Sequence, residues 1–319
     1  MTFFTFSFII IYEHTFVQGV ILMTWEAEEV LFLHFINGKT KQQAIQYDFW
    51  ETEYHRKPLD LLKQLTAKGA IHQSDDLSFT LTQFTVPIIK DLLKKAGLKV
   101  SGNKIDLIER VKAHREFIDL SHLNMESVYT VDESLETFLH DTIFLNYISL
   151  HGPVTIDDAY SYYLRHQDLN ASELIIALHE RRIEESLLQS NKYEAVKCHH
   201  LLSEYYISEL HDNDKSLYHL NHFSMLIVLE SIQRFQQLNP AEKKDTFFNI
   251  DNYTIEKYRN MLIMKQLDIN MLYSIFLEHS VQLPYSEEET LLAVQFIIRC
   301  IIGSESAEEK LIDDLAALD

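Results

Sequence analysis

Apolar residues recur at three- and four-residue spacing along most of the chain, and this spacing predicts α-helices. In the N-terminal part the pattern predicts three helices, over residues 25–36, 39–53 and 58–68. The first of them meets a stop signal at Asn37-Gly38, and the third begins with Pro58, a residue that suits the first helical turn. These helices are the first elements of a small domain.

A different periodicity follows the third helix. Residues 70–73 and 77–82 flank a Ser74-Asp75-Asp76 turn, and apolar and polar side chains alternate along the second segment, which predicts a β-hairpin. Three helices followed by a hairpin is the element order of a winged helix. We therefore expect a winged-helix-like unit over residues 24–84.

A similar order recurs further along the chain. The apolar spacing again predicts three helices, over residues 135–151, 155–165 and 171–181. Thr155 and Asn170 precede the last two and are suitable N-caps. A second hairpin is predicted over residues 186–196, so we expect a second winged-helix-like unit over residues 119–197. The repeat lies in the order of elements and not in residue identity.

From residue 198 onward the pattern is helical almost throughout. It predicts five further helices, over residues 217–238, 253–267, 269–279, 287–302 and 307–318. We expect residues 198–319 to form a helical interaction domain that mediates self-association or binds a protein partner. The predicted fold class of the chain is therefore mainly α.

Between the two predicted units lies a short basic segment, residues 85–115. Thr85 and Pro87 predict the start of a helix whose apolar face carries Ile89, and Gly97 predicts its end. We expect Leu98 and Val100, in the loop that follows, to pack back into a small core. A turn at Ser101-Gly102-Asn103 then leads into a second helix, whose buried face consists of Leu107, Ile108 and Val111.

The charge of this segment is opposite to that of the whole chain. The 319 residues include 28 basic and 48 acidic side chains, a formal charge of −20, which argues against a protein that coats nucleic acid. Residues 86–115, however, carry eight basic and three acidic side chains, a net charge of +5, and the remainder carries −25. An acidic body with one basic face predicts local, steeply salt-dependent binding to DNA.

The basic segment closely resembles the SAP motif, a helix–extended loop–helix module. The motif pattern is Leu-Lys-x-x-Leu-Lys-x-x-Gly-Leu, a Ser-Gly-x-Lys loop, and x-x-Leu-Ile-x-Arg-Leu. Here residues 89–98 are IKDLLKKAGL, residues 99–104 are KVSGNK and residues 105–111 are IDLIERV, without gaps. Ile89 and Val111 replace leucines, and Ala96 stands where a polar or basic residue is frequent. We assign residues 85–118 to this SAP-like motif.

The resemblance implies binding of double-stranded DNA. The backbone N–H groups at the start of the second helix, together with Lys104, suit a phosphate group because the helix dipole and unpaired donors favour an anion there. The residues that we expect to contact DNA are Lys90, Lys94, Lys99, Ser101, Gly102, Asn103, Lys104 and Arg110.

Other chemistries find little support. The seven glycines do not cluster, so no dinucleotide-binding loop is predicted, and the stretch from Gly97 to Lys104 departs from a P-loop at Asn103 and Ile105. His179-Glu180 does not continue into HExxH, and no GxSxG nucleophile motif is present. We therefore predict a non-enzymatic protein with no cofactor.

The two cysteines, Cys198 and Cys300, suggest reduced thiols and a cytoplasmic protein. Cys198 precedes His199 and His200, but consecutive side chains on a helix point about 100° apart, so no metal site is predicted there.

The first 23 residues are strongly apolar. The run from Phe3 to Tyr12 is too short to span a bilayer, which takes about 20 residues, and no basic residue precedes it, so we predict no membrane partner and no signal peptide. Two interpretations remain open. The extension packs on the body of the protein, or Met23 is the native start.

Two hypotheses for function follow. The first is a non-enzymatic, regulatory or architectural protein that binds double-stranded DNA, with further phosphate contacts from basic residues around the third helix (Arg56, Lys57, Lys63 and Lys68). The alternative is a protein-interaction scaffold whose SAP-like and helical modules bind protein partners.

Overall fold

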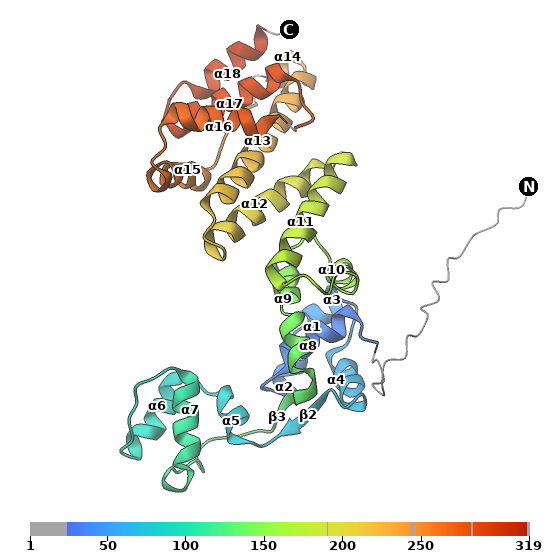
Figure 1. The fold of residues 1–319 in the computed structure, drawn as a ribbon, viewed down its shortest axis with the longest axis vertical. Helices are drawn as coiled ribbons and strands as arrows, with labels where there is room; N and C mark the ends of the chain where they lie inside the picture. Colours follow the sequence, from blue (N-terminus) through green and yellow to red (C-terminus); the bar gives the residue numbers. More distant parts are fainter. Residues whose placement is uncertain (1–23, 190, 244–245, 282, 318–319) are drawn as a thin grey trace, which may run out of the picture.

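The computed structural model describes residues 24–189, 191–243, 246–281 and 283–317. The N-terminal extension over residues 1–23, and with it the choice between its two interpretations, lies outside the described residues. The described chain is mainly helical, as predicted. Figure 1 shows an N-terminal body, a small module that projects from it, and a group of helices near the C-terminus.

The N-terminal body contains four short helices. They are α1 (Ala27–Ile36), α2 (Lys41–Ile45), α3 (Phe49–Thr52) and α4 (Pro58–Ala67). The single helix predicted over residues 39–53 is wrong, because Lys39–Thr40 forms strand β1 and Thr40 is extended. The Thr40 hydroxyl accepts a hydrogen bond from the Gln43 N–H, so α2 begins only after it.

A three-stranded antiparallel sheet joins distant parts of the sequence. Strand β3 (Val128–Val131) lies in the centre, between β1 and β2 (Ile71–Ser74). Ser74 pairs with Val128 and Ile71 pairs with Val131, so the chain leaves the sheet at Ser74 and returns to it at Val128. The SAP-like segment is therefore inserted between two paired strands.

The hairpin predicted over residues 70–82 is wrong. Its first arm is β2, but its second arm is helical, as α5 (Leu77–Thr80) and the 3-10 helix η1 (Leu81–Gln83). The Asp76 carboxylate caps α5 by accepting a hydrogen bond from the Ser78 N–H. Leu77 and Leu81 are four residues apart and pack on the same small core, which is helical spacing that the apparent alternation concealed.

The inserted module consists of α5, η1, α6 (Val86–Lys95), α7 (Lys104–Ala113) and the 3-10 helix η2 (Arg115–Phe117). Its core is built from apolar residues of these elements and of the returning chain, such as Leu93, Leu107 and Ile118, and Thr80 is buried as well. None of its buried residues belongs to either of the other two core clusters. The module therefore has a core of its own.

Beyond the sheet, the chain adds helices to the N-terminal body. These are η3 (Glu133–Leu135), α8 (Glu136–Asp141), α9 (Phe144–Leu150), α10 (Ile156–Tyr163) and α11 (Ala171–Leu188). The predicted caps are confirmed, since the Thr155 and Asn170 side chains accept hydrogen bonds from backbone N–H groups in the first turns of α10 and α11. One core cluster combines α1 and α4 with α9, α10 and α11.

The hairpin predicted over residues 186–196 is also wrong. Helix α11 continues to Leu188, and α12 (Lys192–Ser208) begins four residues later. Ala195, Cys198 and Leu202 are buried at helical spacing, which a strand over residues 193–196 would not allow. This part of the proposed second winged-helix-like unit therefore has no hairpin.

The C-terminal part is helical, as predicted. Its elements are α13 (Asn213–Gln237), α14 (Pro240–Lys243), α15 (Asn252–Lys265), α16 (Ile269–Ser280), α17 (Glu287–Ile301) and α18 (Ala307–Ala316). Of these, α13, α15, α16, α17 and α18 share the largest core cluster with α11 and α12. Within the described residues, no helix has the length and apolar character needed to cross a membrane.

Candidate nucleic-acid interface

Helices α6 and α7 pack their apolar faces together and leave their basic residues outside. Ile89, Leu92 and Leu93 of α6 are buried, as are the predicted residues Leu107, Ile108 and Val111 of α7. Because these positions repeat at helical spacing, the lysines between them face solvent. In the connecting loop Leu98 packs on the core as expected, whereas the expectation for Val100 is wrong, since its side chain is exposed.

The turn into α7 requires a glycine. Gly102 has φ +126°, and a Cβ there would lie 2.9 Å from Asp106 Cβ, so a side chain would clash. The close approach brings Asp106 back over the turn. Asp106 Oδ2 accepts a hydrogen bond from the Asn103 N–H at 3.0 Å, while Asn103 Oδ1 accepts one from the Asp106 N–H at 2.9 Å.

This capping box changes the expected phosphate site at the start of α7. The Asp106 carboxylate occupies part of the space where an anion was expected, and it satisfies the Asn103 N–H. The N–H groups of Lys104 and Ile105 have no hydrogen-bond partner in the part of the chain that the structure describes. The Lys104 and Ile105 N–H groups are therefore the donors that remain unpaired at this end of α7 within the described residues.

Three of the predicted contact residues carry available positive charge. The side chains of Lys90, Lys94 and Lys99 are exposed and have no ion pair or hydrogen bond among the described residues. Lys95, which was not in the predicted set, pairs with Asp91 at 2.8 Å, and its ammonium lowers the pKa of that carboxyl. The three free lysines are therefore the best placed to contact phosphates.

Two other predicted contact residues form hydrogen bonds with backbone carbonyl groups of the protein. Arg110 Nη1 donates to the carbonyl oxygens of Lys99 at 2.8 Å and Ser101 at 3.0 Å, so its guanidinium holds the loop between the helices. Lys104 Nζ donates to the Thr82 carbonyl oxygen at 2.7 Å. Both side chains are on the predicted face, but their primary contacts are intramolecular.

Contacts that sequence reasoning missed join α7 to α5 within the module and join the segments that enter and leave it. Lys112 Nζ donates to the Ser78 hydroxyl at 2.7 Å, and Gln83 Nε2 donates to the Glu126 carbonyl oxygen at 2.8 Å. Ser127 donates to the Asp75 carboxylate where the two connecting segments meet. The helical spacing of Leu77 and Leu81 was the only sequence signal that the module begins this early.

The basic residues around α4 are mostly neutralised. Arg56 pairs with Glu26, Lys63 pairs with Asp60 at 3.3 Å, and Lys68 pairs with Glu29 at 2.7 Å. Only Lys57, of the four residues considered, has no such partner within the described chain. This surface therefore offers little free positive charge to a phosphate backbone.

Comparison with known families agrees with this geometry. Residues 80–116 match the family model of the SAP domain. We call this stretch the SAP segment. The match begins before the predicted start and includes Lys104, its partner Thr82, and Lys112. No curated protein and no solved structure matches the chain.

The thiols and histidines of the C-terminal half form a different environment. Cys198 and Cys300 are free cysteines, and burial raises the pKa of their thiols to about 12 and about 11. His199 forms a hydrogen bond with His219, with 3.0 Å between their Nδ1 atoms. Across the described ranges, no group of three or more His, Cys, Asp or Glu side chains is arranged to hold a metal ion.

Proposed function

We propose that the protein binds double-stranded DNA through the SAP segment and that it is not an enzyme. The observation that carries this proposal is the SAP-domain match over residues 80–116, which carry a net charge of +4 and three unpaired lysines. The capping box leaves two N–H donors near these lysines. The rest of the chain, with a charge of −24, would repel DNA and restrict contact to this face.

Titration with duplex DNA at several salt concentrations tests the proposal. Each phosphate contact contributes about −0.9 to the slope of log K against log salt. We expect the triple variant K90A/K94A/K99A to reduce the magnitude of the slope by about 2 to 3 and to abolish measurable binding at 150 mM salt.

A matched control removes lysines that are already paired. Lys63→Ala/Lys68→Ala removes two positive charges that bind carboxylates, and it should leave both affinity and slope nearly unchanged. Absence of binding by the unaltered protein at about 50 mM salt would refute the proposal.

A specific observation also favours a protein partner for the C-terminal helices. Ile263, Met264 and Met271 lie around the turn between α15 and α16, and between half and three quarters of each side chain is exposed. Apolar side chains gathered in this way are typical of a contact surface. Light scattering after size exclusion would detect self-association, and Ile263→Ser/Met271→Ser should weaken it.

A further inference from the structure

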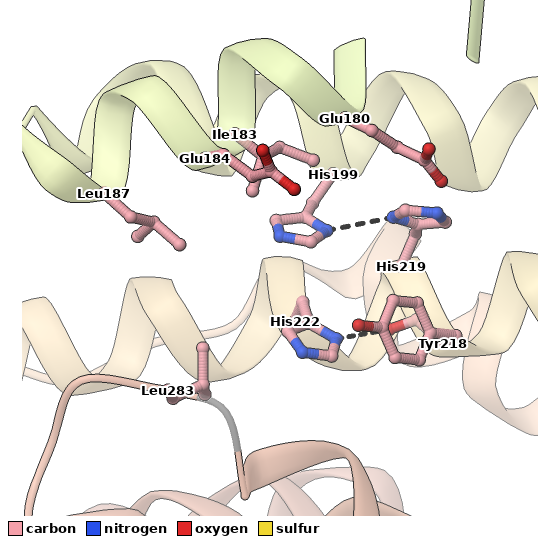
Figure 2. Close-up of a pocket in the computed structure, with 9 residues that line it drawn as sticks. All are labelled: Glu180, Ile183, Glu184, Leu187, His199, Tyr218, His219, His222 and Leu283. Carbon is pink, nitrogen blue, oxygen red and sulfur yellow. Dashed lines mark hydrogen bonds between the residues drawn. The ribbon is translucent and has the colours of Figure 1, made fainter. Parts of the chain in front are cut away.

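A pocket of about 370 Å³ lies among the helices at the start of the C-terminal part. Its lining comes from α11 on one side and from α12 and α13 on the other. Figure 2 shows the Glu180 and Glu184 side chains extending from α11 toward the rings of His199 and His219. The volume is at the lower end of the range for small-molecule sites, which is roughly 300–1,000 Å³.

Three imidazoles form the wall opposite the carboxylates. His199, His219 and His222 line the pocket, and at most 4% of each residue is exposed. Burial lowers the pKa of His219 to about 3 and of His222 to about 4, and it lowers the pKa of His199 as well. All three rings are therefore neutral at pH 7.

The hydrogen bonds of these rings determine which of their outer nitrogens carries a proton and which carries a lone pair. His222 Nδ1 lies 2.9 Å from the Tyr218 carbonyl oxygen, so the neutral ring carries its proton on Nδ1 and a lone pair on Nε2. His199 and His219 share one proton between their Nδ1 atoms, so one of them also carries a lone pair on Nε2 and the other an N–H.

The outer nitrogens of these rings have no protein partner. No hydrogen bond to any of the three Nε2 atoms is found in the described part of the chain. These Nε2 atoms differ from His179 Nε2 and His200 Nδ1, which are buried away from solvent and have no hydrogen-bond partner. The three Nε2 atoms therefore border the open space of the pocket.

The carboxylates are similarly unpaired. Both glutamates are exposed, and neither forms an ion pair among the residues that the structure describes. Desolvation raises the pKa of Glu180, while the charge of Lys215 lowers it. No lysine or arginine lines the pocket. The acceptors of the pocket are two carboxylates and two imidazole lone pairs. Its donors are a single imidazole N–H and the Tyr218 hydroxyl. The site is therefore rich in acceptors and negatively charged.

We propose that this pocket binds a primary alkylammonium ion. An ammonium group has three N–H donors and one positive charge, which match the acceptors and the charge of the site. Its alkyl stem would lie against Ile183, Leu187 and Leu283, the apolar part of the lining. A metal ion fits less well, because the ligating side chains are not grouped to hold one in the described residues.

Calorimetric titration of the full chain with n-butylamine at pH 7 tests this inference. We expect saturable binding, at least about tenfold weaker in Glu180→Gln/Glu184→Gln, because the variant loses both carboxylate charges that attract the ammonium group. Glu209→Gln removes an exposed carboxylate outside the pocket and should change nothing. Imidazole ¹⁵N spectra should show the Nε2 signals of the pocket histidines shifting on binding.

Neutral n-butanol, which has the same stem, should not bind. The inference is overturned by absence of saturable amine binding, by equal binding of n-butanol, or by unchanged affinity in the double variant. Binding of Zn²⁺ in place of the amine would overturn it as well. Circular dichroism of both variants checks that their helices are intact, and none of these results bears on DNA binding.

Discussion

The SAP segment and the C-terminal helices place their ionisable side chains in opposite positions. In the SAP segment the lysines Lys90, Lys94 and Lys99 are outside, and the buried side chains are apolar except for Thr80. In the C-terminal helices the histidines His199 and His219 are inside, within a polar cluster. Exposed charges respond to salt, whereas buried imidazoles respond to protons. The two regions should therefore be sensitive to different solution conditions.

The two regions also differ in how they connect to the rest of the chain. Ile176 of α11 packs against both the N-terminal core and the C-terminal core, so these two parts share a helix. The core of the SAP segment shares no residue with either. Cooperative unfolding should thus couple the first two parts more strongly than either couples to the SAP segment.

Acidification should produce the largest contrast between the regions. The folded-state pKa values of His219 (about 3) and His222 (about 4) lie below the ordinary value of 6.5. Below pH 6.5 the unfolded chain therefore binds protons that the folded chain does not, and stability falls as the pH drops toward 4. We expect a loss on the order of several kcal/mol, measured by urea unfolding of the C-terminal helices at pH 7, 5.5 and 4.5.

Other groups at the pocket do not reverse this sign. The raised pKa of Glu180 favours the folded state as the pH falls from that raised value to the ordinary value of 4.5, but this is one group against three histidines whose pKa values are lowered. At the start of α5, the hydrogen bond from the Ser78 N–H lowers the pKa of Asp76. The contribution of Asp76 to stability is therefore lost only below about pH 3.8. DNA binding should therefore persist at pH 5.

A pair of variants isolates the histidine effect. His222→Asn keeps a donor at the Nδ1 position and removes the titration, so the loss of stability between pH 7 and pH 4.5 should shrink. His140→Asn changes an exposed histidine and should leave the pH profile as it is. Equal pH profiles in the original protein and His222→Asn would show that the buried cluster is not the cause.

The next largest contrast should come from shortening one buried side chain, which should destabilise one region and not the other. Leu93 is fully buried in the small core of the SAP segment, and Leu93→Ala should cost about 2–5 kcal/mol there. Hydrogen exchange should accelerate in α6 and α7, and DNA binding should disappear, while the thermal transition of the C-terminal helices stays in place. Ile297→Ala, in the C-terminal core, should have the converse effect. A single shared transition in both variants would contradict the separation of the cores.

The elements whose signals are local could be predicted from sequence. The caps at Thr155 and Asn170, the start at Pro58 and the two SAP helices depend on residues within a few positions, and all are found. The apolar faces of α6 and α7 followed from the same helical spacing. The mainly α fold class follows from the sum of such signals.

Pairings between distant residues could not be predicted in this way. β2 pairs with β3 across the whole SAP segment, and nothing within residues 70–82 indicates that its partner follows residue 127. The bond between His199 and His219 depends on how α12 packs against α13. Charge counting likewise placed Arg110 among the DNA contacts, because a sequence does not show which carbonyl groups a guanidinium can reach.

Substitution of Arg110 should have the smallest effect, and it tests whether this residue holds the loop or contacts DNA. The Arg110 guanidinium positions the loop by donating to both the Lys99 and the Ser101 carbonyl oxygens. Arg110→Lys keeps the positive charge but should lose this pair of hydrogen bonds. We then expect Arg110→Lys and Arg110→Ala to weaken duplex binding alike, by about tenfold, which corresponds to about 1.4 kcal/mol. The amide signals of Lys99 to Gly102 should shift in both variants before any DNA is added.

Lys94→Ala is the matched comparison, because Lys94 has no partner in the described chain and its loss leaves the loop intact. It should reduce the salt slope by about 0.9 and leave the free-protein spectrum of the loop unchanged. Full rescue of affinity by Arg110→Lys, together with a reduced slope in Arg110→Ala, would instead make Arg110 a phosphate contact. In that case the DNA-contacting surface of the SAP segment would extend onto α7, and the loop would owe its shape to Gly102 and the capping box alone.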